Sequence, residues 1–128
     1  MTFNAKNLHA FIAGYLEALF FADSATNEDG ETVENLSGLD LSAAAMDECR
    51  HDCAQFLDLA GAKVMLAIAG SDDYDHTQAG RDFWFSRQGH GVGFWDRGLG
   101  VVGDDLHNVA EHFGEKHLYI VNSLIEVE

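Results

Sequence analysis

The stretch GRDFWFSRQGHGVGFWDRG, residues 80–98, decides the fold that the sequence predicts. It contains both tryptophans of the chain, and aromatic residues are interleaved with charged ones on either side of the centre Gln88-Gly89-His90-Gly91. Two short aromatic runs joined by a glycine-rich turn are typical of a β-hairpin. The sequence therefore predicts strands over residues 82–87 and 92–96. Alternation along the first strand places Phe83 and Phe85 on one face and Trp84 on the other.

The hydrophobic pattern predicts helices around this hairpin. Apolar residues recur at spacings of three and four over residues 7–23, 42–60 and 104–113, as in amphipathic helices. Ser42 is a suitable N-cap for the second helix. The apolar run 63–69 favours a buried helical continuation that ends at Gly70, with a central strand as the alternative. A further short helix is expected over residues 71–79, with Gly80 as its end.

The last segment, residues 117–127, predicts a second hairpin with Asn122-Ser123 as its two-residue turn. A chain of 128 residues is long enough to bury one core. The sequence thus predicts a single α+β domain over residues 1–128. In it, helices pack on one face of a small, roughly four-stranded antiparallel sheet.

The charge of the chain restricts its partners. Twenty-two acidic residues against seven lysines and arginines give a net charge of −15. Such a field repels phosphate backbones and anionic lipids and attracts basic surfaces. We therefore expect no direct nucleic-acid or membrane partner, and a basic protein surface as the partner; the alternative is that the acidity serves solubility.

The chain shows neither a run of 18 apolar residues nor the basic start of a secretory signal, so the expected location is cytoplasmic.

Nine acidic residues and no lysine or arginine lie between Lys6 and Arg50, so this part of the chain is one continuous negative region. Residues 23–41 are expected to form a solvated acidic loop, since turn residues are frequent there and apolar ones sparse. An exposed tryptophan beside an arginine is typical of a binding hot spot, although core packing is the commoner use of tryptophan. The candidate partner-binding residues are Asp23, Glu28, Asp29, Glu31, Glu34, Asp40, Trp84, His90, Trp95 and Arg97.

Catalytic and metal-binding chemistry has little support in the sequence. Cys49 and Cys53 lie one helical turn apart, which orients them poorly for a disulfide, and no further ligand pair completes a zinc site. They are expected to be buried as small apolar residues. The histidines match no ligand spacing, so no metal or cofactor and no enzymatic role is expected. The alternative is a small metal-dependent or acid–base enzyme centred on His90, Asp82 and Asp96.

The glycines of residues 89–93 do not form a phosphate-binding loop, because the strand–loop–helix context and the Lys-Ser/Thr ending are missing. Arg81, Arg87 and Arg97 could line a basic pocket in this region. The acidic composition instead favours their pairing with carboxylates.

Two pieces of the chain resemble a family of small acidic proteins encoded by bacteriophages and prophages. AGRDFWFSRQGHGVGFWDRG, residues 79–98, resembles one motif of that family, and MDECRHDCAQFL, residues 46–57, is similar to a second motif built on Asp-Cys-x-x-Phe-Leu. The family commonly has histidine where this chain has Arg81, so no ligand or base role is carried over to that position.

The resemblance implies a phage accessory protein in the bacterial cytoplasm. Many such proteins counter host defence, anti-CRISPR inhibitors among them. The combined expectation is a non-enzymatic inhibitor that mimics DNA and binds the basic, nucleic-acid-binding surface of a host defence complex. A structural or self-associating accessory protein, and hence an oligomer, is a further alternative.

Overall fold

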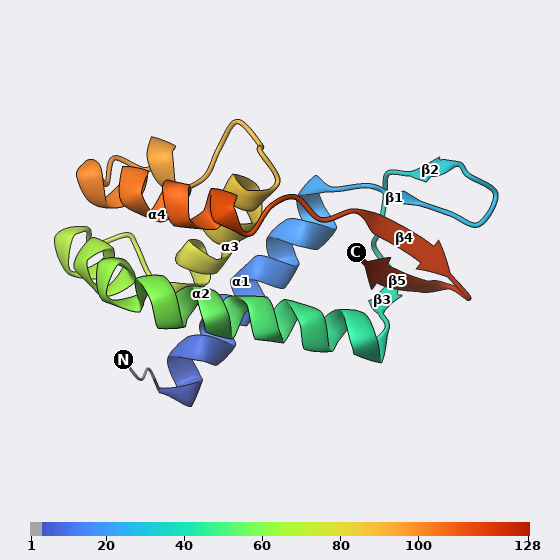
Figure 1. Cartoon of the computed structure of the whole chain (residues 1–128), viewed down its shortest axis with the longest axis horizontal. Helices are drawn as coiled ribbons and strands as arrows, with labels where there is room; N and C mark the ends of the chain where they lie inside the picture. The colour runs from blue at the N-terminus through green and yellow to red at the C-terminus, as the bar shows by residue number, and fades with distance from the viewer. Residues whose placement is uncertain (1–3) are drawn as a thin grey trace.

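The computed structural model describes residues 4–128, which form four α-helices, one 3-10 helix and five short strands (Figure 1). In chain order these are α1 (Ala5–Ala22), β1 (Ala25–Thr26), β2 (Thr32–Val33), β3 (Asp40–Leu41), α2 (Ala43–Gly70), α3 (His76–Arg87), η1 (Phe94–Asp96), α4 (Val101–His112), β4 (Leu118–Val121) and β5 (Leu124–Val127). The α+β class is therefore confirmed.

Helices α1, α2 and α4 follow the hydrophobic pattern. Ser42 caps α2 as predicted, because its side chain accepts a hydrogen bond from the backbone N–H of Ala45. The helix is 28 residues long and ends at Gly70, so the helical continuation is confirmed and the strand alternative is wrong. The predicted burial of this continuation is wrong for its outer side, where Met65 is 45 % and Leu66 60 % exposed. By length and composition α2 meets the criterion for a membrane span, a criterion that the core helices of soluble proteins also meet.

The predicted hairpin over residues 82–96 is wrong. Its first half belongs to helix α3, and its second half contains only the short helix η1. Helix α3 begins at His76 after the N-cap Asp75 and runs through Gly80, so the predicted helix over residues 71–79 is wrong at both ends. Gly80 lies inside the helix because α1 approaches it closely: a Cβ there would lie 1.9 Å from the carbonyl oxygen of Phe11. Gly80, predicted to end a helix, instead allows α1 and α3 to pack closely against each other.

The helical conformation also changes where the aromatic side chains point. Phe83 and Trp84 are both fully buried, whereas strand alternation would have placed them on opposite faces. The Phe83 ring stacks on Phe56 of α2 at 4.3 Å between centroids, and Trp84 meets Tyr15 of α1 edge-on at 5.2 Å. Successive residues of α3 therefore join α1 and α2 in one aromatic core.

The sheet has five strands in the order β2-β1-β4-β5-β3, and it is mixed. Strand β1 is parallel to β4 and β3 is parallel to β5, while the other pairs are antiparallel. The predicted four-stranded antiparallel sheet is corrected accordingly. The difference arises because the segment 23–41, predicted to be a loop, supplies β1, β2 and β3. The predicted C-terminal hairpin is confirmed, with positive φ at Asn122 and Ser123 (52° and 65°) as a type I′ turn requires.

The two faces of the sheet differ in their surroundings. The cross-strand pairs Leu118–Val127 and Ile120–Ile125 face the helices and belong to the core or pack against it. By alternation the pairs Tyr119–Glu126 and Val121–Leu124 point to the other face, where Val121 is 40 % and Leu124 39 % exposed. The sheet lies at one end of the molecule, next to the end of α1 and the start of α2 (Figure 1). One of its faces is therefore open.

Candidate functional site

The acidic segment 23–41 lies along both edges of the sheet. Strand β2 forms one edge and β3 the other, and both come from this segment. Within residues 4–128, no lysine or arginine nitrogen lies within 4.0 Å of its five carboxylates after Asp23. These carboxylates are Glu28, Asp29, Glu31, Glu34 and Asp40. The sheet is thus bordered by negative charge that no nearby cation of the described chain compensates.

The cations of the chain are paired elsewhere. Five of the seven lysines and arginines form ion pairs, and none of their partners belongs to the segment 23–41. The pairs are Lys63–Asp105, Arg81–Glu17, Arg87–Asp52, Arg97–Asp82 and Lys116–Glu48. The prediction that Arg81, Arg87 and Arg97 pair with carboxylates is confirmed. These lysines and arginines neutralise carboxylates outside the segment 23–41, and the carboxylates that border the sheet keep their negative charge.

The open face of the sheet contains a hollow of about 300 Å³. Tyr119 and Val121 line it together with the carboxyl-bearing residues Glu28, Glu126 and Glu128. Glu28 is held in place because its Oε1 accepts a hydrogen bond, 3.0 Å long, from the backbone N–H of Asn122. Apolar and aromatic residues thus line this hollow together with three residues that carry carboxyl groups.

A second hollow, of about 480 Å³, lies between the end of α1 and the chain after β2. It is lined by Phe20 and Phe21 of α1, by Glu34, and by Glu17, whose carboxylate is paired with Arg81. Phe21 is 86 % exposed. Aromatic rings beside carboxylates suit lysine and arginine side chains, which interact with both groups. We use the name acidic sheet surface for the two hollows and the bordering carboxylates. Its residues are Phe20, Phe21, Glu28, Asp29, Glu31, Glu34, Asp40, Tyr119, Val121, Leu124, Glu126 and Glu128.

Asp23 has a structural role at the start of the acidic segment. Its Oδ2 accepts a hydrogen bond of 2.6 Å from Trp84 Nε1 and lies 3.1 Å from His90 Nε2. Trp84 is fully buried, so its interpretation as an exposed hot-spot candidate is wrong. Asp23, Trp84 and His90 therefore fasten the acidic segment to the helical part.

Of the two tryptophans only Trp95 is exposed, to 50 %. It lies in η1, which packs against α3 and α4 rather than against the sheet. Arg97 follows directly and donates a hydrogen bond of 3.0 Å from its Nε to Asp82 Oδ1. The structure therefore does not bring Trp95 and Arg97 together with the acidic segment.

Asp82 is a buried carboxylate whose hydrogen bonds lie within the core. It accepts hydrogen bonds from Tyr74 Oη at 2.8 Å, Gln78 Nε2 at 3.1 Å and Arg97 Nε at 3.0 Å. Removal from water raises the pKa of Asp82 above its ordinary value, and these hydrogen bonds, with the charge of Arg97, oppose the increase. The residue joins α3 to the chain on either side of it.

Arg87 has a similar structural role. Its guanidinium donates to Asp52 Oδ2 at 2.8 Å, to Tyr15 Oη at 3.0 Å and to the carbonyl oxygens of Phe113 and Gly114. It therefore links α1, α2 and the end of α4 around α3. The charged residues interleaved with aromatics in the central stretch are internal connections.

The three groups of the alternative catalytic site are engaged separately. His90 contacts Asp23, Asp82 lies in the network described above, and Asp96 Oδ1 accepts a hydrogen bond from the backbone N–H of Gly93. Over residues 4–128, no three side chains of His, Cys, Asp or Glu are grouped as a metal ion requires. Among the described residues, no hydrogen bond or ion pair joins His90, Asp82 and Asp96 to one another.

The two cysteines are buried and free, as predicted from their place on the apolar face of α2. Burial raises the pKa of Cys49 to about 12, helped by the nearby carboxylates of Asp52 and Glu48. Their thiols are accordingly protonated at neutral pH, and a thiolate is the form that acts as nucleophile or metal ligand.

Comparison with known proteins gives no relative: no family model, no curated protein and no solved structure matches the chain. The resemblance to phage-encoded proteins stays a prediction. The candidate site consequently depends on the geometry of this chain alone.

The outer residues of the C-terminal hairpin were missed by sequence reasoning. Tyr119, Val121, Leu124 and Glu126 share the open face because a two-residue turn at Asn122-Ser123 sets the register of the pairs. The turn was predicted from the sequence, and counting alternate residues outward from it could have identified which side chains share this face. The parallel contacts that place β1 and β3 beside it have no comparable signal in the sequence.

Proposed function

We propose that this protein is a non-catalytic binding protein whose acidic sheet surface binds a basic surface of another protein. One observation carries the proposal. Carboxylates without a lysine or arginine partner in the described chain border an open sheet face with an apolar, aromatic centre. Charge at the rim with aromatic groups at the centre is the arrangement by which protein interfaces combine steering with affinity.

Electrostatics supports a partner that is itself positive. A net charge of −15 repels nucleic acids and anionic membranes at long range and accelerates encounter with a basic protein. At short range, lysine or arginine side chains of the partner would reach the hollows, where Tyr119 or Phe21 and neighbouring carboxylates can contact them.

Basic protein surfaces of this kind commonly bind nucleic acid, because lysine and arginine contact phosphates. We propose that the acidic sheet surface occupies such a surface and competes with the nucleic acid for it. The resemblance to phage proteins favours a defence complex in the cytoplasm of a bacterial host as the target. The protein would then act as an inhibitor by mimicking the charge of DNA.

The test compares two variants that have the same charge. In the surface variant, four bordering carboxylates are neutralised. In the control variant, four exposed carboxylates away from the sheet are neutralised. Each set of changes reduces the negative net charge from −15 to −11. The surface variant is Glu28→Gln, Glu31→Gln, Glu34→Gln and Asp40→Asn. The control variant is Asp58→Asn, Asp72→Asn, Asp73→Asn and Glu115→Gln.

Each protein is titrated against purified nucleic-acid-binding defence complexes of the host, with displacement of bound nucleic acid as the readout and with ionic strength varied. We expect displacement by the wild type and the control variant, weakening as salt is added, and little displacement by the surface variant. Equal loss in both variants would mean that net charge alone acts, and the proposed surface would be wrong. Binding that is insensitive to salt would also contradict the proposal.

A further inference from the structure

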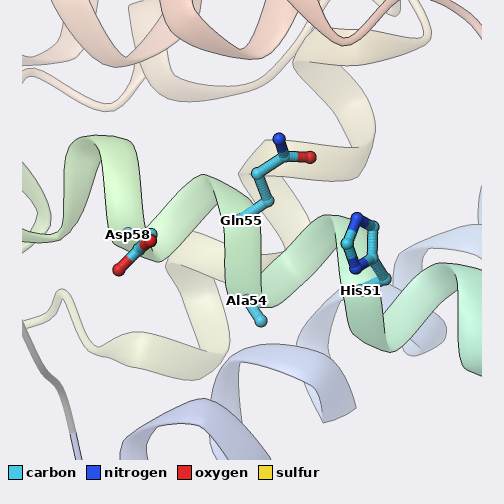
Figure 2. Close-up of a pocket in the computed structure, with 4 residues that line it drawn as sticks. All are labelled: His51, Ala54, Gln55 and Asp58. Atoms are coloured by element: carbon cyan, nitrogen blue, oxygen red, sulfur yellow. The ribbon is translucent and has the colours of Figure 1, made fainter.

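The outward face of α2 changes character half-way along the helix. Figure 2 shows the first half, where His51, Ala54, Gln55 and Asp58 follow one another along the outer side of the helix. Beyond Asp58 the same side carries apolar residues, among which Leu59 is 68 % and Leu66 60 % exposed. A helix that is apolar all round is usually covered on all sides. In this part of α2 the inner side is buried and the outer side is open.

The apolar side continues onto the start of α4. Lys63 of α2 and Asp105 of α4 form an ion pair of 3.0 Å, which brings the two helices together at this level. One turn before Asp105 lies Val101, which is 74 % exposed. Exposed apolar side chains gathered on neighbouring helices mark an interaction surface.

The spacing of the residues on the outer side indicates the partner. Leu59, Ala62, Leu66 and Ala69 recur at intervals of three and four, the spacing of a coiled-coil seam in which large and small side chains alternate. If a second copy lies antiparallel across a two-fold axis midway between Ala62 and Leu66, Leu59 meets Ala69 of the second copy. Ala62 then meets Leu66 of the second copy. Every large side chain therefore faces an alanine, as self-complementary packing requires.

The local charge permits a second copy at this face. Between Leu59 and Ala69 the only charged residue is Lys63, and it is neutralised within its own chain. Two copies with a net charge of −15 repel each other at long range, and contact through this uncharged side of α2 adds no like-charge pair to that repulsion. Figure 1 also shows that the end of α2 lies away from the sheet, so pairing here leaves the acidic sheet surface free.

We propose that the protein forms a two-fold dimer through the second half of α2, with Leu59, Ala62, Leu66 and Ala69 at its centre. This inference does not depend on the function proposed above. Sedimentation equilibrium of the full chain, over micromolar to millimolar concentrations, should show the mass rising from the monomer value of 14.0 kDa toward twice that value. Leu66→Asp should keep the protein monomeric, whereas Phe21→Asp, an equal change at an exposed residue of α1, should leave the dimer intact.

The antiparallel register is tested by exchanging large and small residues. Ala62→Leu alone overfills both symmetric contacts and should raise the dissociation constant about tenfold or more. The double variant Ala62→Leu, Leu66→Ala restores one large and one small residue at each contact and should recover dimerisation. Circular dichroism of each variant as a monomer verifies that the fold is unchanged.

Several results would overturn the proposal. A wild-type mass that stays at 14.0 kDa throughout would do so, as would a dimer that Phe21→Asp abolishes and Leu66→Asp does not. Tighter association of Ala62→Leu than of the wild type would indicate unspecific apolar adhesion instead of the register. Binding to neutral lipid vesicles in place of self-association would assign the face to a membrane.

Discussion

Replacement of Gly80 by alanine is the sharpest test of how the helices pack. Helix α3 crosses α1 so closely that a Cβ at Gly80 would lie 1.9 Å from the carbonyl oxygen of Phe11 and 3.0 Å from the backbone nitrogen of Tyr15. Both obstacles are backbone atoms, which cannot rotate away as a side chain can. A reciprocal contact exists at Gly14, where a Cβ would lie 1.9 Å from the carbonyl oxygen of Thr77.

Two opposing effects determine the magnitude. In an isolated helix, glycine to alanine stabilises by about 1 kcal/mol. Here the two backbones must separate until the new Cβ is at least 3.0 Å from the oxygen, which loosens the packing of Phe83 and Trp84 against α1. Overpacking of this kind costs about 3 kcal/mol at the upper end of its usual range. The expected net loss is about 2 kcal/mol of unfolding free energy, a large share of the roughly 5–15 kcal/mol of a typical domain.

Urea denaturation followed by tryptophan fluorescence and circular dichroism measures this loss. Gly70→Ala is the matched control, because a Cβ at the exposed end of α2 meets nothing within 4 Å. The control should be neutral or slightly stabilising. The double variant Gly14→Ala, Gly80→Ala should lose less than the sum of the single losses, since both changes open the same helix pair. If Gly80→Ala stabilised the protein as it would an isolated helix, the close approach of α1 and α3 would be refuted.

Three further predictions concern single groups. Trp84→Phe removes the 2.6 Å hydrogen bond to Asp23 and should lower the unfolding free energy by about 2 kcal/mol in urea titrations; an unchanged value would contradict the structural role of this contact. Because burial raises the pKa of Asp82, the stability that it contributes is present below pH 3.8 and is lost as the pH rises through the folded-state pKa. The unfolding free energy of Asp82→Asn should therefore rise relative to that of the wild type across this window, and a parallel pH dependence of the two proteins would be inconsistent with the shift. Cys49 and Cys53 should react slowly with a thiol reagent in the folded protein and rapidly in urea, because they are buried and the pKa of Cys49 is about 12; fast reaction of the folded protein would show that the thiols are accessible.

The helices were largely predictable from the sequence because their signals are local. Ser42 as a cap and the apolar spacing over residues 42–60 define most of α2 without knowledge of its neighbours. The stretch around Gly80 was not predictable in the same way. Whether a glycine ends a helix or allows another helix to approach depends on a second chain segment, here α1, that local patterns do not include.

For the candidate site too, the local features were predictable from the sequence and the contacts between distant segments were not. The acidic segment and its charge are evident from the sequence, and so is the C-terminal turn. Their assembly is not, because β1 and β3 join the C-terminal hairpin through parallel contacts between residues far apart in the chain. Trp84 was misassigned to the surface for a related reason: in α3 the helical period buries it together with Phe83, whereas Trp95 is exposed.

A map of where a basic probe binds tests the acidic sheet surface most directly. Amide chemical shifts of the isotope-labelled protein are followed while an arginine-rich peptide is added at low and at high salt. We expect the shifts to concentrate at Tyr119, Val121 and Leu124 and along residues 28–40, and to vanish at high salt. Shifts spread evenly over the acids of the helical part, such as Asp58 and Asp72, would contradict this expectation.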